Sequence, residues 1–155
     1  MEGKRIFYPD VTLEFVATSA AGTMLEHIGI EFLELGDNYL VARMPVDHRT
    51  RQPLGLLHGG ASLALAETLG SMGAYCCVDR DHQDVVGVEI NANHLKAMRS
   101  GFVYGTSSPV HMGRTTQVWE TKIRDEAGGL VCVSRMTLAV IAKRDPDRKE
   151  GTSRP

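Results

Sequence analysis

The pattern of apolar and polar positions along the chain is dominated by one long apolar run, GASLALAETLGSMGAYCCV, at residues 60–78. The run approaches the length of a membrane span, but it contains one charged residue, three glycines and several small polar residues. These features favour a helix buried inside a soluble protein. Gly70 and Gly73 weaken a helix relative to alanine, and they make sense if another backbone packs closely against that face.

Alternating or continuous apolar positions predict six strands around this helix. In the fifth strand Trp119, Thr121 and Ile123 share one face, and the residues between them share the other, which is typical of a half-buried strand. The predicted strands cover residues 28–35, 39–45, 85–94, 102–110, 115–124 and 130–142.

The remaining segments are short or polar. Asp10 is predicted to cap a first helix over residues 11–19, and polar loops are predicted at 20–23, 47–57 and 79–84. The length of 155 residues suits one domain, which we place at residues 1–142. The charged tail, residues 143–155, contains proline and glycine, and we expect it to be disordered.

The order of these elements predicts the fold. A short helix and two strands precede the long helix, and the last four strands are joined by short connections, so we expect those four to form an antiparallel meander. A sheet with one apolar face must cover that face, and the long helix is the obvious cover. We therefore predict an α+β protein with the hotdog fold, in which a curved antiparallel sheet wraps around one long central helix.

Composition narrows the function classes. The formal net charge of -2 and the sparse aromatic residues give no case for nucleic-acid binding. Three cysteines, two of them adjacent, do not make a disulfide framework, which favours a reducing, cytoplasmic compartment. No signal-peptide pattern follows the first residues, and no histidine and cysteine spacing suggests zinc. We expect no metal, nucleic-acid or membrane partner.

Glu67 is the only charged side chain in the apolar run. An ionised carboxylate is costly in such surroundings unless something satisfies it or uses it. The run is preceded by His58 and Gly59, and the first N–H groups of a helix have no partner within it and lie at the positive end of its dipole. The amide of Gly59 or Gly60 can therefore polarise a substrate carbonyl as an oxyanion hole does.

Helix geometry separates these two groups. Gly59 and Glu67 are eight residues apart, or roughly 12 Å along one helix. One carbonyl cannot touch both groups of the same helix. If both act on it, they come from two copies of the chain, and the site lies between antiparallel helices at a dimer interface. Gly70 and Gly73 would then serve close helix packing.

Three other side chains have more than one reading. Ser71 shares a helix face with Glu67, so it can orient the carboxylate or hold a water, or it can simply be small enough for helix packing. Gln52, in the preceding loop, can donate to the acyl oxygen or hold a bound group. His58 can fix the loop or hydrogen-bond near the substrate carbonyl. Glu67 itself can also be a buried acid that Gln52 or Ser71 satisfies.

At these residues the chain resembles the hotdog-fold acyl-CoA thioesterases. The resemblance covers residues 29–141 and follows the branch that contains the 1,4-dihydroxy-2-naphthoyl-CoA thioesterase of menaquinone biosynthesis and a proofreading thioesterase of enterobactin synthesis. Thr68 departs from the serine that relatives tend to have. The matching stretches are MPVD at 44–47, RTRQPLGLLHGGAS at 49–62, LAETLGS at 65–71, VGVEINANH at 86–94 and HMGRT at 111–115.

The resemblance implies a role for each site residue. Glu67 is the nucleophile or general base, the Gly59 amide polarises the thioester carbonyl, and three residues position substrate and water, namely Gln52, His58 and Ser71. Arg114 pairs with a CoA phosphate, which suits its guanidinium. No cofactor is implied beyond the CoA of the substrate, and the family forms homodimers or dimer-of-dimers tetramers without a metal. The residues expected along the CoA or acyl channel are Gly87, His94, His111, Met112, Gly113, Arg114 and Thr115.

Two alternatives come from other classes. A hotdog acyl-CoA hydratase or dehydratase also pairs a histidine with an acid, although its helix entry differs. A non-catalytic acyl-CoA binding module would retain the phosphate contacts and could lose the acid. Within the thioesterase reading the acyl group stays open, with aromatic groups such as dihydroxynaphthoyl, benzoyl or phenylacetyl favoured. The carrier (CoA or a protein) and the mechanism (covalent anhydride or activated water) also stay open.

Overall fold

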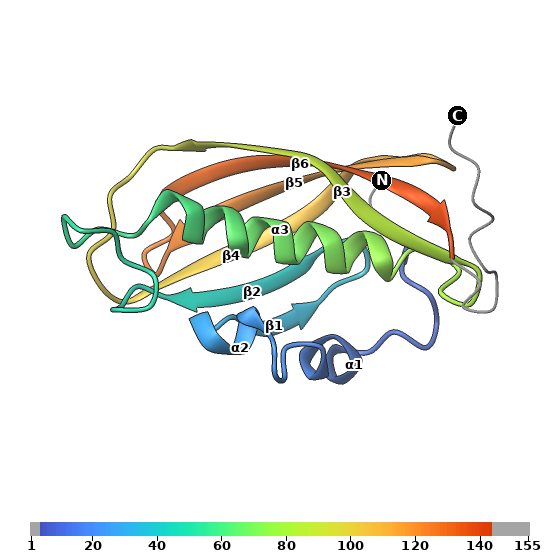
Figure 1. The fold of residues 1–155 in the computed structure, drawn as a ribbon, viewed down its shortest axis with the longest axis horizontal. Coiled ribbons are helices and arrows are strands. Elements are labelled where there is room, and N and C mark those ends of the chain that lie inside the picture. Colours follow the sequence, from blue (N-terminus) through green and yellow to red (C-terminus); the bar gives the residue numbers. More distant parts are fainter. Residues whose placement is uncertain (1–3, 144–155) are drawn as a thin grey trace, which may run out of the picture.

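The computed structural model describes residues 4–143. One six-stranded antiparallel sheet curves around the long helix α3 (Gly59–Tyr75), and two short helices, α1 (Leu13–Thr18) and α2 (Met24–Ile28), lie beside the sheet (Figure 1). This is the α+β hotdog arrangement that the sequence predicts. The tail predicted to be disordered lies, apart from Lys143, outside the described residues. The strands are β1 (Glu31–Leu35), β2 (Leu40–Pro45), β3 (Gln83–His94), β4 (Phe102–Met112), β5 (Thr116–Asp125) and β6 (Leu130–Ala142).

The predicted meander of the last four strands is wrong in one place. The sheet order is β1-β2-β4-β5-β6-β3, so β3 pairs with β6 and β2 occupies the free side of β4. The connection over residues 95–101 must span three strand spacings of about 4.8 Å each, or roughly 14 Å. Seven extended residues reach about 23 Å. A loop that looks short in the sequence is therefore long enough to cross the end of the sheet.

The N-terminal segment also differs from the prediction. Helix α1 begins after Thr12, whose hydroxyl accepts the Phe15 amide at 3.1 Å, so Asp10 is not its cap. Helix α2 replaces the start of the predicted first strand. It ends at Gly29, whose φ of 74° is a left-handed conformation that favours glycine. Strand β1 therefore begins only at residue 31.

Helix α3 packs one face against the sheet. Its buried positions are Ser62, Leu65, Ala66, Leu69, Gly70, Gly73 and Ala74. The side chain of Trp119 is fully buried beneath this face. A Cβ atom at Gly73 would lie 2.6 Å from the Trp119 ring, and one at Gly70 would lie 3.1 Å from the Met136 sulfur. Both glycines therefore make room for side chains of the chain's own sheet, and not for another backbone as the sequence suggested.

The helix also ends earlier than the apolar run. It stops at Tyr75, and Cys76 and Val78 continue as buried residues outside the helix. Among residues 4–143, no helix combines the length and hydropathy that a membrane crossing requires.

The contact of Gly73 with Trp119 predicts an asymmetric effect of two alanine substitutions. Gly73→Ala should lower the free energy of unfolding by about 1–2 kcal/mol, because an added methyl collides with a rigid buried ring. Gly70→Ala is the matched control, since it meets the flexible end of a methionine and gains helix propensity of up to about 1 kcal/mol. Urea unfolding of both variants measures the difference. Equal stabilities for the two variants would contradict this account of the core.

Candidate active site

The start of helix α3 is held by His58. The backbone N–H of His58 donates to the Thr50 carbonyl at 2.8 Å, and the His58 ring nitrogen Nδ1 accepts the Gly60 amide at 2.8 Å. The side chain of His58 is thus a helix cap, which agrees with the loop-fixing reading. None of the described residues accepts a hydrogen bond from the Gly59 amide. Of the two candidate oxyanion donors, only the Gly59 amide is therefore available to a ligand.

Gln52, Gly59 and His94 lie together. They line one pocket of about 360 Å³ between the loop before α3 and the end of β3. The His94 ring packs closely on Gly59: a Cβ atom added at Gly59 would lie 2.8 Å from His94 Nε2. The side-chain oxygen Oε1 of Gln52 accepts the Leu54 backbone amide, which leaves the side-chain NH₂ group of Gln52 as a donor. This pocket therefore combines the Gly59 amide with two further polar side chains.

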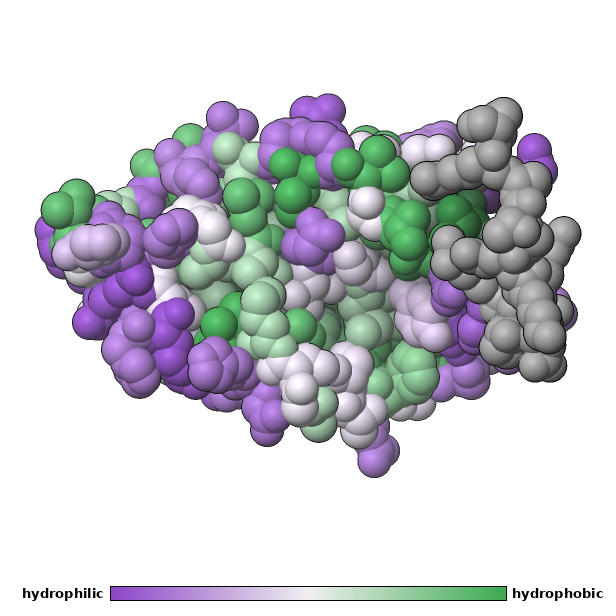
Figure 2. Space-filling model, viewed as in Figure 1, coloured by the Kyte–Doolittle hydropathy of each residue, from purple (hydrophilic) through white to green (hydrophobic). Residues whose placement is uncertain are grey.

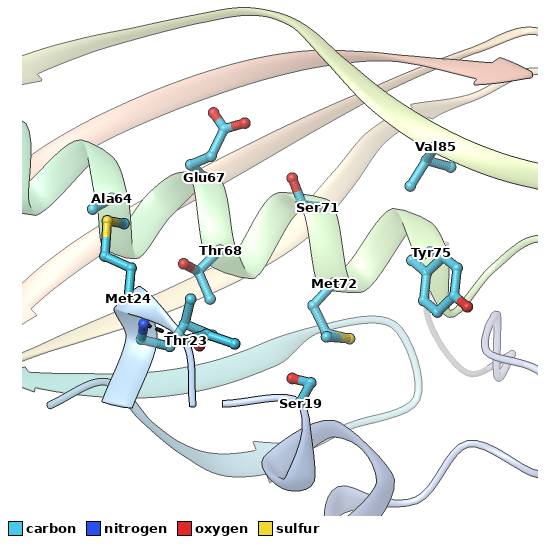
Figure 3. Close-up of a pocket in the computed structure, with 11 residues that line it drawn as sticks. Ser19, Thr23, Met24, Ala64, Glu67, Thr68, Ser71, Met72, Tyr75 and Val85 are labelled. Atoms are coloured by element: carbon cyan, nitrogen blue, oxygen red, sulfur yellow. Dashed lines mark hydrogen bonds between the residues drawn. The ribbon is translucent and has the colours of Figure 1, made fainter. Parts of the chain in front are cut away.

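Glu67 lies in a different pocket. It extends from the side of α3 that faces strand β3, and it lines a mostly apolar pocket of about 470 Å³ (Figure 3). Ser71, Thr68 and Met72 of the same helix, together with Val85 of β3, also line this pocket. The sequence spacing of Glu67 and Ser71 correctly places both on one helix face.

The Glu67 carboxylate is half-buried and, among the described residues, accepts no hydrogen bond. Burial raises the pKa of this carboxyl above its ordinary value of 4.5. Gly87 of β3 leaves room for this carboxylate, because a Cβ atom added at Gly87 would lie 2.8 Å from Glu67 Oε1. The Ser71 hydroxyl contacts the Met136 sulfur at 3.9 Å instead of the carboxylate. Neither Gln52 nor Ser71 satisfies Glu67, so the reading of Glu67 as a satisfied structural acid is not supported.

The predicted channel residues do not form one cluster within the chain. His111 and Met112 end β4, and residues 113–115 form the turn into β5. This turn lies at the end of the sheet nearest the C-terminus of α3, far from the helix start (Figure 1). Arg114 is exposed. The structure joins His94 to Gly59 and Gly87 to Glu67, and it leaves residues 111–115 apart from both.

Several lining residues of the Glu67 pocket were not predicted. Ala64, Thr68, Met72 and Tyr75 recur at helical spacing before and after Glu67, so their positions were available from the sequence. Val85 comes from strand β3, and four further residues come from the segment around α2, which the sequence analysis did not recognise as a helix. They are Ser19, Thr23, Met24 and Leu25.

Over the face shown in Figure 2, apolar and weakly polar side chains gather above α3 and the neighbouring β3, and strongly polar side chains crowd the end formed by the loop before α3. In the described part of the chain, no three or more histidine, cysteine, aspartate or glutamate side chains are placed to hold a metal ion. The chemistry available in these residues is that of a carboxylate and a backbone amide.

Comparison with known proteins agrees with this chemistry. Residues 54–132 match the sequence model of the thioesterase superfamily. The proofreading thioesterase EntH of Cronobacter turicensis is 54% identical over 131 residues, which are 84% of this chain and 95% of that protein. The 1,4-dihydroxy-2-naphthoyl-CoA hydrolase of Escherichia coli K12 is 49% identical over 131 residues, which are 84% and 96% of the two chains.

Solved structures show the same architecture. A thioesterase of Haemophilus influenzae superposes with a TM-score of 0.87 at 44% identity, over 92% of this chain and 99% of that one. A mutant thioesterase of Pseudomonas aeruginosa has a TM-score of 0.87 at 43% identity, over 89% and 99%. The fold, the sequence match and these relatives agree: the chain belongs to the thioesterase superfamily and is a thioesterase.

Proposed function

We propose that this thioesterase hydrolyses an acyl-CoA with an aromatic acyl group, using Glu67 as nucleophile or general base and the Gly59 amide as oxyanion donor. The observation that carries the proposal is the unpaired Glu67 carboxylate beside a largely apolar pocket of about 470 Å³, a size that suits a one- or two-ring acyl group. The Escherichia coli relative is a 1,4-dihydroxy-2-naphthoyl-CoA hydrolase, which supports an aromatic substrate.

The two reacting groups belong to separate pockets of one chain, and a second copy of the chain would join them. Strand β3 is one of the two outer strands of the sheet, and Val86 and Val88 on it are 43% and 64% exposed. A long apolar edge strand is a template for pairing with another chain. Gly87 lies beside Glu67 and His94 lies beside Gly59. Antiparallel pairing of two β3 strands that sets residue 87 opposite residue 94 would therefore bring Glu67 of one copy to Gly59 of the other.

The same pairing would unite the predicted channel. The turn over residues 113–115 lies far from the Gly59 end of its own chain. In the dimer, its residues would line a site that the second copy completes. Arg114 is exposed there and is proposed to contact a CoA phosphate. Dimers of this kind, or tetramers made from two of them, are the proposed assembly.

Removal of the Glu67 carboxylate should abolish turnover. Glu67→Gln and Glu67→Ala should lower kcat/KM for benzoyl-CoA by about a hundredfold or more, the usual loss of a general base. Thiol release measures the rate, and Glu14→Ala, an exposed acid on α1, is the control. Wild-type rates in Glu67→Ala would end this mechanism.

The pH profile should report the same group. Glu67 acts in its ionised form, so kcat/KM should fall as the pH drops through the Glu67 pKa. Because burial raises that pKa, the midpoint of the acid limb should lie above 4.5. The measurement is kcat/KM for benzoyl-CoA between pH 4 and 8, with thiol release followed at each pH. A midpoint at or below 4.5 would show that another group controls this limb.

The Gly59 amide can be deleted with a matched control. Gly59→Pro removes the N–H at the first helical position, where proline is tolerated, and the extended backbone of His58 suits a following proline. Gly59→Ala adds a similar Cβ contact with His94 but retains the N–H. The proline variant should lose about a hundredfold or more in kcat relative to the alanine variant, as expected for one oxyanion donor. Equal kcat values would assign the oxyanion to another group.

Mixed dimers test whether the site is shared. Co-expressed Gly59→Pro and Glu67→Ala chains form heterodimers in which one site has both groups and the other has neither. If chains pair at random, activity should recover to about a quarter of wild type, since half the dimers are mixed and half their sites are complete. Each variant purified alone is the control. No recovery, with heterodimers confirmed by differential tags, would place both groups in one chain.

A further inference from the structure

The N-terminal arm, residues 4–29, forms one wall of the pocket that contains Glu67. Ser19, Thr23 and Met24 face α3 across this pocket, opposite Thr68 and Met72 (Figure 3). Leu25 also lines the pocket. The wall is therefore built from α2 and from the linker between α1 and α2. The mechanism proposed above assigns no role to any of these residues.

The base of the arm is fixed to the end of α3. Val11 and Val16 are buried in the core, and the Tyr8 amide donates to the Cys76 carbonyl at 3.0 Å. Arg80 forms an ion pair with Asp10. Its guanidinium also lies over three aromatic rings, at 5.5, 5.2 and 6.0 Å from the centroids of Tyr8, Phe15 and Tyr75. Such cation–π contacts add to the ion pair, so this end of the arm is well anchored.

The tip of the arm is held differently. Within the part of the chain that the structure describes, the hydrogen bonds of residues 19–23 all have partners between residues 16 and 27. Leu25 and Ile28 pack α2 onto the core, whereas Met24 is 57% exposed. The identity of the side chain at position 24 is therefore not constrained by the hydrophobic core.

Met24 separates two cavities. It lines the pocket that contains Glu67, and it also lines a neighbouring pocket of about 260 Å³ beside His58 and Gly60. Ala64 of α3 is the one other residue that lines both pockets, and the Met24 side chain extends toward it (Figure 3). A shorter side chain at position 24 would connect the two cavities, and a larger one would reduce the space beside Glu67.

We propose that Met24 determines which acyl groups the enzyme accepts, by limiting how far the acyl group extends from Glu67 toward the His58 side. This inference rests on the proposed function, because it needs the acyl group to occupy the Glu67 pocket. Methionine suits such a wall, since its flexible, polarizable thioether adapts to flat aromatic surfaces. The arm would then act on specificity while α3 supplies the chemistry.

The test compares acyl groups of different size in position-24 variants. Wild type, Met24→Ala and Met24→Trp are assayed by thiol release with propionyl-CoA, benzoyl-CoA and 2-naphthoyl-CoA. The ratio of kcat/KM for naphthoyl to propionyl should rise in the alanine variant and fall in the tryptophan variant, each by about tenfold, as is usual for hydrophobic pocket contacts. Leu13→Ala, an exposed arm residue that does not line this pocket, should leave the ratio within about twofold.

The outcomes separate this inference from the proposed function. Thermal unfolding should be unchanged in the Met24 variants because the side chain is exposed, so altered ratios would not reflect misfolding. If hydrolysis needs Glu67 but both Met24 variants retain the wild-type ratio, or all three substrates change equally, the inference is overturned and the proposed function stands. If wild type hydrolyses none of the three, or Glu67→Ala is fully active, the proposed function fails and the inference fails with it.

Discussion

The packing of one face of α3 against the curved sheet is the constraint on which the rest of the structure depends. Trp119 is fully buried, and Gly73 gives its ring space that no larger residue would leave. This contact fixes the rotation of the helix about its own axis. Because helical positions repeat every 3.6 residues, a fixed rotation also decides which residues lie toward the β3 edge of the sheet, and Glu67 and Ser71 are among them.

A helix held in this way keeps two polar groups available that most folds would satisfy. The Glu67 carboxylate is half-buried without a hydrogen-bond partner among the described residues, and burial raises its pKa. The Gly59 amide is free there because the His58 ring takes the Gly60 amide. Unsatisfied groups of this kind cost stability, and such costs are typical of catalytic sites, where the missing partner is the substrate.

The sequence was informative wherever structure follows from local pattern. Apolar periodicity placed the long helix and the strands to within a few residues, and helical spacing put Glu67 and Ser71 on one face. Pairing between distant segments was less predictable: the sequence order suggested that β3 would lie beside β4, whereas β3 pairs with β6 and a seven-residue connection crosses the end of the sheet to β4. Helix α2 was missed, although Thr23 and Glu26 have the spacing of a capping box and Gly29 ends the helix. That omission also concealed the arm as a wall of the pocket.

The separation of Gly59 from Glu67 links the fold to the proposed chemistry. Both groups belong to one straight helix, so no side-chain rotation can bring them to the same carbonyl. Two residues of β3 are separated in the same way: Gly87 lies beside Glu67, and His94 lies beside Gly59. A two-fold axis between these positions would relate the halves of two sites at once, because an isologous contact uses each surface twice. The exposed valines of β3 would then be covered by the same contact that completes the site, so assembly and activity would depend on one strand edge.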